Sequence, residues 1–68
     1  MMSIILYTTH CPKCEVLTQK LKNKNINFEI IDDIELIKEK NITMVPVLSV
    51  NDQLMNFKEA VDWINNYN

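Results

Sequence analysis

The only two cysteines of this 68-residue chain, Cys11 and Cys14, are separated by two residues and follow the apolar run at residues 4–7. A pair at this spacing, placed between a strand and a helix, can open and close a disulfide with little movement of the backbone. Thiol–disulfide exchange is therefore the first chemistry that the residues suggest.

The two cysteines are not equivalent in their local sequence. Pro12 suits the first position of a helix, where its missing N–H removes no hydrogen bond, so Cys11 falls at or just before the helix start. Unpaired N–H groups and the positive end of the helix dipole favour a thiolate there, and Lys13 adds a cation nearby. Cys14 lies one turn further, on the buried side, and we expect it to keep a higher pKa and to act as the resolving thiol.

Other roles for the cysteine pair stay open. A zinc or iron–sulfur site generally needs four ligands, whereas this chain offers two cysteines and one histidine, His10. We therefore expect no metal in a single chain, with a metal bridged between two chains as an alternative. A purely structural disulfide would close a very short loop and add little stability. His10 is either an exposed loop residue or a group that tunes Cys11.

Length and composition limit the class of protein. A chain of 68 residues that is 47% hydrophobic forms one small domain over residues 1–68 and depends on its core. A net charge of −2 argues against a nucleic-acid binder, and no apolar run reaches the roughly 18 residues of a membrane span. The N-terminus lacks the features of a signal peptide, so we expect a cytoplasmic protein, where a lone Cys-x-x-Cys is more often catalytic or metal-binding than structural.

The hydrophobic periodicity predicts the element order β-α-β-α-β-β-α. Strands are expected at 3–7, 27–31, 47–50 and 53–55, and helices over about 12–23, 33–40 and 57–66. Asp32 or Asp33 can cap the second helix, with Leu36 and Ile37 turned inward. Because the chain has no glycine, Asn41 is expected in the left-handed conformation at a helix end, and residues 51–52 as a hairpin turn.

A second motif supports the redox interpretation. Val45-Pro46 leads into the strand at 47–50, and a proline there marks a strand start or a special turn. With Cys11-Pro12-Lys13-Cys14 and the element order, this motif makes the whole chain resemble the glutaredoxin/thioredoxin superfamily, and it looks closest to the small glutaredoxin-like proteins. The resemblance implies an α/β minimal thioredoxin fold, with a four-stranded mixed sheet flanked by three helices.

The resemblance also implies roles for the site residues. Pro46 would be a cis-proline facing the cysteine pair, and the backbone of Val45, next to Met44, would hold the substrate. We expect a monomeric oxidoreductase that reduces disulfide-containing proteins, with Cys11 attacking and Cys14 resolving. No cofactor would be bound, and electrons would come from a thioredoxin reductase or from glutathione as a co-substrate.

The region before the last helix bears on the choice of electron donor. Glutathione-using glutaredoxins typically carry a Gly-Gly pair there and a threonine two residues before the proline, whereas this chain has no glycine at 55–59 and has Met44 at the threonine position. Because glycine permits close approach of a ligand to the backbone, we expect weak coupling to glutathione. A glutathione-dependent glutaredoxin that uses Cys11 alone stays an alternative, as does a metal- or cluster-binding module.

Overall fold

A mixed four-stranded sheet, in the order β2-β1-β3-β4, forms the centre of the computed structural model, which describes residues 3–67. The strands are β1 (Ile4–Tyr7), β2 (Glu29–Ile31), β3 (Val47–Val50) and β4 (Gln53–Met55). β1 runs parallel to β2 and antiparallel to β3, and β3 runs antiparallel to β4. The parallel pair needs a long crossover connection, which a helix supplies, whereas a tight turn joins β3 to β4.

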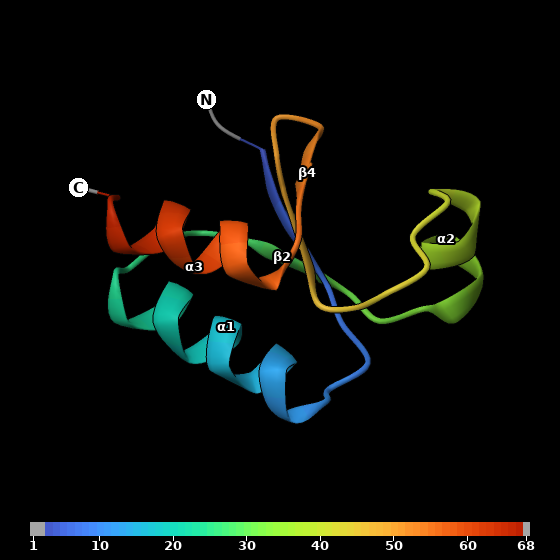
Figure 1. The fold of residues 1–68 in the computed structure, drawn as a ribbon, viewed down its shortest axis with the longest axis horizontal. Helices are drawn as coiled ribbons and strands as arrows, with labels where there is room; N and C mark the ends of the chain where they lie inside the picture. Colours follow the sequence, from blue (N-terminus) through green and yellow to red (C-terminus); the bar gives the residue numbers. More distant parts are fainter. Residues whose placement is uncertain (1–2, 68) are drawn as a thin grey trace.

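Three helices cover the two faces of this sheet: α1 (Pro12–Asn23), α2 (Ile34–Glu39) and α3 (Phe57–Asn65). Helices α1 and α3 lie side by side on one face, and α2 lies on the other (Figure 1). The predicted minimal thioredoxin fold is confirmed, with strand and helix ends that differ by one or two residues; β2, for example, begins at Glu29 rather than at residue 27. Within residues 3–67 no helix has the length and apolar character that a membrane crossing would require.

The larger core fills the space between the sheet and the helix pair α1/α3. Side chains alternate between the two faces along a strand, so every second residue of β1 and β3 points into this core. Its buried members are Ile4, Leu6, Leu17, Leu21, Ile26, Leu48, Val50, Ala60 and Ile64. This packing fixes the position of α1, and therefore of the cysteines at its start.

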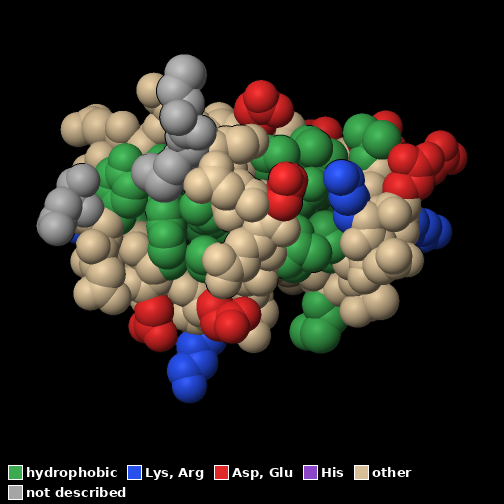
Figure 2. Space-filling model, turned by 90° about the horizontal axis from the view of Figure 1, so that it is seen from above, with side chains coloured by type: hydrophobic (Ala, Val, Ile, Leu, Met, Phe, Trp, Pro, Cys, Tyr) green, Lys and Arg blue, Asp and Glu red, His purple; other side chains and the backbone are tan. Residues whose placement is uncertain are grey.

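The opposite face of the sheet carries a smaller core of Tyr7, Ile37 and Ile42 beneath α2. The expectation that both Leu36 and Ile37 turn inward is wrong for Leu36, which is 46% exposed. A helix of six residues presents a single narrow stripe to the sheet, and Ile37 occupies it. Apolar side chains reach the surface on the face seen in Figure 2, as expected for a chain too small to bury all of its apolar area.

Asparagine and aspartate make the turns that glycine makes in most proteins. Asn41 has a φ of 59°, which confirms the predicted left-handed helix end, and Asn51 and Asp52 have φ values of 50° and 70°. Positive φ at both central residues is the signature of the type I′ turn that joins strands of a hairpin. Asn and Asp tolerate this geometry better than other residues with a Cβ, but at a cost that glycine avoids.

The turn geometry predicts the effect of one substitution. Asp52→Gly relieves the clash of a Cβ atom at positive φ but makes the unfolded chain more flexible, so we expect a net gain of about 0.5 kcal/mol in the free energy of unfolding. Asp52→Ala, which keeps the Cβ and loses the local polar group, is expected to lower that free energy. Urea denaturation of the three proteins measures both changes, and a glycine variant less stable than the alanine variant would contradict the assigned turn.

Candidate redox site

Cys11 is the N-cap residue of α1, with an extended backbone at φ −72° and ψ 168°. Its sulfur accepts a hydrogen bond from the backbone N–H of Cys14 at 3.3 Å, and its carbonyl oxygen accepts one from the N–H of Glu15 at 2.9 Å. The sulfur thus takes the place that a serine or aspartate oxygen usually has at a helix start. The predicted positions of Cys11 and of Pro12 at the first helical residue are both confirmed.

The two cysteines differ in accessibility. Both are free thiols, but the side chain of Cys14 is 0% exposed, whereas Cys11 is half-buried. A sulfur atom of another molecule can therefore approach Cys11 but not Cys14. The predicted burial of Cys14 on the inner side of the first helical turn is confirmed.

The expectation that burial would keep the pKa of Cys14 high is wrong. Burial alone raises the pKa of this thiol, but hydrogen bonds from the side chains of Cys11 and Thr8, and from the backbone of Thr9 and Cys11, together more than offset that effect. The pKa of Cys14 therefore lies below its ordinary value of 9.0. The clear difference between the two thiols is their accessibility.

Thr8 belongs to the site although its sequence position did not single it out. It follows β1 directly and is only 1% exposed. Its hydroxyl bonds to the Cys14 sulfur, and its Oγ1 accepts a hydrogen bond from the N–H of His10 at 2.9 Å. The sequence could have indicated Thr8 by its position directly after a buried strand, because a polar side chain that is buried there needs a hydrogen-bond partner.

His10 adopts a left-handed backbone conformation, with a φ of 62°, immediately before Cys11. Its ring Nε2 lies 3.0 Å from Asp32 Oδ2, and its Nδ1 lies 3.9 Å from Glu15 Oε1. All three side chains are more than half exposed, so these contacts add about 0–1 kcal/mol each. This exposure favours the interpretation of His10 as an exposed loop residue over its interpretation as a group that tunes Cys11.

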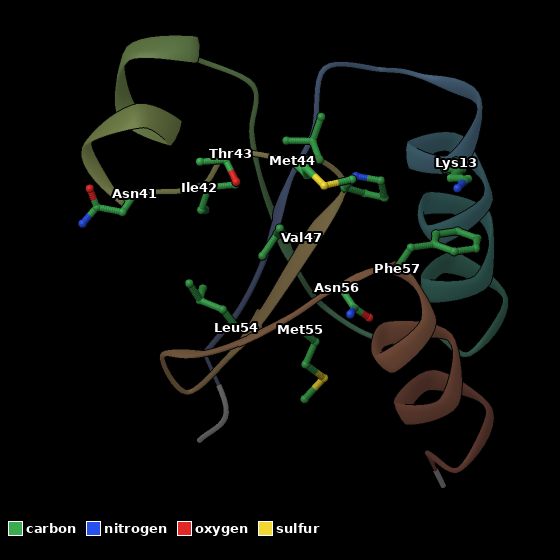
Figure 3. Close-up of a pocket in the computed structure, with 12 residues that line it drawn as sticks. Lys13, Asn41, Ile42, Thr43, Met44, Val47, Leu54, Met55, Asn56 and Phe57 are labelled. Carbon is green, nitrogen blue, oxygen red and sulfur yellow. The ribbon is translucent and has the colours of Figure 1, made fainter.

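A groove of about 390 Å³ begins beside the cysteine motif. One wall is the segment 41–47, and the other is formed by the end of β4 and the start of α3 (Figure 3). Lys13 reaches over the ring of Phe57, with its Nζ 5.4 Å from the ring centroid, and closes one end. The lining residues are Lys13, Asn41, Ile42, Thr43, Met44, Val45, Pro46, Val47, Leu54, Met55, Asn56 and Phe57.

The Val45–Pro46 peptide bond is cis, as the resemblance implied. Pro46 is buried and Val45 half-buried, whereas Met44 is 78% exposed. The structure thus brings Lys13 and Met44-Val45-Pro46, which are far apart in the sequence, into one groove. The two cysteines lie next to this groove, at the start of the same helix as Lys13, rather than in its lining.

Eight of the twelve lining residues were not among the sequence-predicted site residues, and Leu54 and Asn56 are two of these eight. Leu54 and Asn56 come from β4 and from the N-cap of α3, and only the pairing of β4 with β3 places them opposite the segment 41–47.

Within residues 3–67, no three His, Cys, Asp or Glu side chains are grouped so that they could hold a metal ion.

Comparisons with known proteins are informative at the level of the structure. No protein-family model matches the chain, and no curated protein matches it by sequence. Among solved structures, the chain is similar to a crystal structure of glutaredoxin 1 from Francisella tularensis in complex with cacodylate. The two share 29% sequence identity, the TM-score is 0.71, and the match covers 98% of this chain and 100% of the other.

The sheet order, the helix placement and the cysteine pair at the start of α1 define a protein of the thioredoxin fold. The structural match over nearly the whole chain narrows the class further. The chain is a glutaredoxin-like protein.

The hydrogen bond between Thr8 and Cys14 leads to a second prediction. Thr8→Val keeps the shape of the side chain but removes the hydroxyl, and with it one of the bonds that favour the Cys14 thiolate. We therefore expect the pKa of Cys14 to rise, so that its thiolate forms at higher pH. Ultraviolet absorbance of the thiolate, followed as a function of pH, measures the shift.

Thr8→Ser is the matched control, because it keeps the hydroxyl and should titrate close to the wild-type protein. The valine variant also leaves the N–H of His10 without its acceptor, which we expect to lower the free energy of unfolding by about 1 kcal/mol. A valine variant that is folded by circular dichroism and titrates at the wild-type pH would show that Thr8 has no part in the ionisation of the pair.

Proposed function

We propose that this protein is a thiol–disulfide oxidoreductase that reduces disulfides in other proteins by a two-cysteine mechanism. The observation that carries the proposal is the asymmetry of the pair, with a half-buried Cys11 at the helix start and a fully buried Cys14 hydrogen-bonded to it. A thiolate at a helix N-terminus is a recurrent arrangement for a sulfur nucleophile. The adjoining groove gives a bound protein segment a place beside that sulfur.

The reaction has two exchange steps. In the first, the Cys11 thiolate attacks one sulfur of the substrate disulfide, so that a Cys11–substrate disulfide forms and the other substrate sulfur leaves as a thiolate. In the second, the Cys14 sulfur attacks Cys11, which releases the second substrate thiolate and forms the Cys11–Cys14 disulfide. Two electrons have then passed from the cysteine pair to the substrate, and the protons are exchanged with solvent.

The lowered pKa of Cys14 supports its role in the second step. The attacking group must be a thiolate, and an ordinary buried thiol would ionise too rarely near neutral pH. The hydrogen bonds from Thr8 and from the backbone around Cys11 offset the burial. Cys14 can therefore be hidden from outside reagents and still respond quickly to the mixed disulfide.

Regeneration of the thiols needs an outside reductant, and the start of α3 bears on its nature. Asn56 Oδ1 accepts a hydrogen bond from the N–H of Glu59 at 2.8 Å, and Glu59 Oε1 accepts one from the N–H of Asn56 at 3.0 Å. This capping box uses groups that could otherwise bind the charged end of a small peptide such as glutathione. We therefore favour a thioredoxin reductase over glutathione as the electron donor, in a reducing compartment such as the cytoplasm.

Substitution of each cysteine by serine tests the mechanism. Cys11→Ser should lower the rate of reduction of a protein disulfide, such as that of insulin, by at least about a thousandfold, because it removes the nucleophile. Cys14→Ser should instead accumulate a covalent complex with the substrate, because the mixed disulfide can no longer be resolved. Turnover is measured with dithiothreitol as the reductant, and the complex is detected by non-reducing electrophoresis and mass spectrometry.

Retained activity in Cys11→Ser would reverse the assignment of the two thiols. Full multiple-turnover activity in Cys14→Ser, with no complex, would favour a mechanism that uses Cys11 alone. Stoichiometric zinc or iron in the purified wild-type protein, lost in either variant, would favour the metal-binding alternative.

A further inference from the structure

We infer that the groove beside the cysteine pair selects its substrates: it accepts an extended segment of a client protein that carries a bulky apolar residue next to the disulfide cysteine, and it disfavours a cationic residue there. The inference rests on the proposed function, because it names the substrate class of the same site. Three features of the groove support it: two exposed apolar side chains, a single charged residue, and the start of α3, where a capping box pairs the backbone N–H groups of Asn56 and Glu59.

Two of the six large apolar side chains that are exposed in the described part of the chain line this groove. Met44 is 78% exposed, the most of any large apolar residue in the described part of the chain, and Leu54 is 48% exposed. Both line the groove, and Val47 lies between them in Figure 3. Apolar side chains that line one hollow of this size are typical of a binding site, and the flexible thioether of methionine adapts to partners of different shape.

Lys13 is the only charged residue in the groove lining. Its ammonium group lies over the face of Phe57, a contact that favours this position of the cation. A lysine or arginine of a substrate, brought into the same groove, would meet a like charge with no carboxylate in the lining to balance it. Repulsion between Lys13 and a cationic substrate residue discriminates against that substrate, although Lys13 adds little affinity for the preferred apolar substrate.

The start of α3 argues for a protein segment rather than a small charged peptide. The capping box already pairs the backbone N–H groups of Asn56 and Glu59, and Asn56 lines this end of the groove. The groove also begins at Lys13, on the first turn of the helix that Cys11 caps. A segment whose disulfide lies at Cys11 would therefore run past Val45 and place a neighbouring side chain against Met44 and Leu54.

Three synthetic peptides test the inference. Each carries one cysteine in a mixed disulfide with thionitrobenzoate, and they differ only in the residue next to that cysteine, which is leucine, serine or lysine. Wild-type protein reduces the mixed disulfide to peptide thiol and coloured thionitrobenzoate while its own pair is oxidised to the Cys11–Cys14 disulfide. The second-order rate constant follows from the release of thionitrobenzoate.

We expect the leucine peptide to react about three- to tenfold faster than the serine peptide, the difference expected from burial of one apolar side chain. The lysine peptide should react more slowly than the serine peptide, and that difference should shrink as salt screens Lys13. In Met44→Thr, and further in Met44→Thr with Leu54→Thr, the ratio of the leucine to the serine rate should fall towards one.

Ile34→Thr is the matched control. Ile34 is 57% exposed but lies on α2 and does not line the groove, so the same kind of substitution should leave the leucine-to-serine ratio unchanged. Equal rates for the three peptides, or a ratio that falls as much in Ile34→Thr as in Met44→Thr, would overturn the inference and leave the proposed function standing. No release of thionitrobenzoate from any peptide would instead contradict the proposed function itself.

Discussion

The hydrogen bond from the Cys14 N–H to the Cys11 sulfur, at 3.3 Å, is the contact on which the chemistry of this protein depends. It exists only because α1 begins at Pro12, so that the first-turn N–H groups point back at the residue before it. Helix α1 is in turn held by Leu17 and Leu21 against the sheet and α3. The core thus fixes the position of α1, and with it the position of the Cys11 sulfur at the helix start.

The second constraint is the burial of a polar cluster beneath that sulfur. Thr8 and Cys14 are both essentially inaccessible, and an unpaired polar group in such a place would destabilise the fold by about 1–3 kcal/mol. Here each group is satisfied by another member of the cluster. The same bonds that satisfy Thr8 and Cys14 also favour the thiolate, so the requirement of folding and the requirement of redox chemistry coincide.

The sequence predicted the element order, the helix start at Pro12 and the left-handed turns, because each depends on short-range chemistry: hydrophobic spacing, the missing N–H of proline, and the tolerance of asparagine for positive φ. It was wrong about Leu36, since which of two adjacent apolar residues faces the sheet depends on how a short helix docks. It was also wrong about the pKa of Cys14, because the bonds from Thr8 form only when the end of β1 meets the first turn of α1. The placement of Leu54 and Asn56 in the groove likewise depends on the pairing of β4 with β3, and residue spacing alone does not reveal that pairing.

The proposed mechanism depends most on the contrast between an accessible Cys11 and a buried Cys14. Competitive alkylation measures that contrast directly. The reduced, folded protein is treated with limiting iodoacetamide near neutral pH, and the modified residue is identified by mass spectrometry of its proteolytic peptides. We predict that Cys11 is modified at least about ten times faster than Cys14, and that the difference disappears in denaturant. Equal modification of the two thiols in the folded protein, or faster modification of Cys14, would contradict the account.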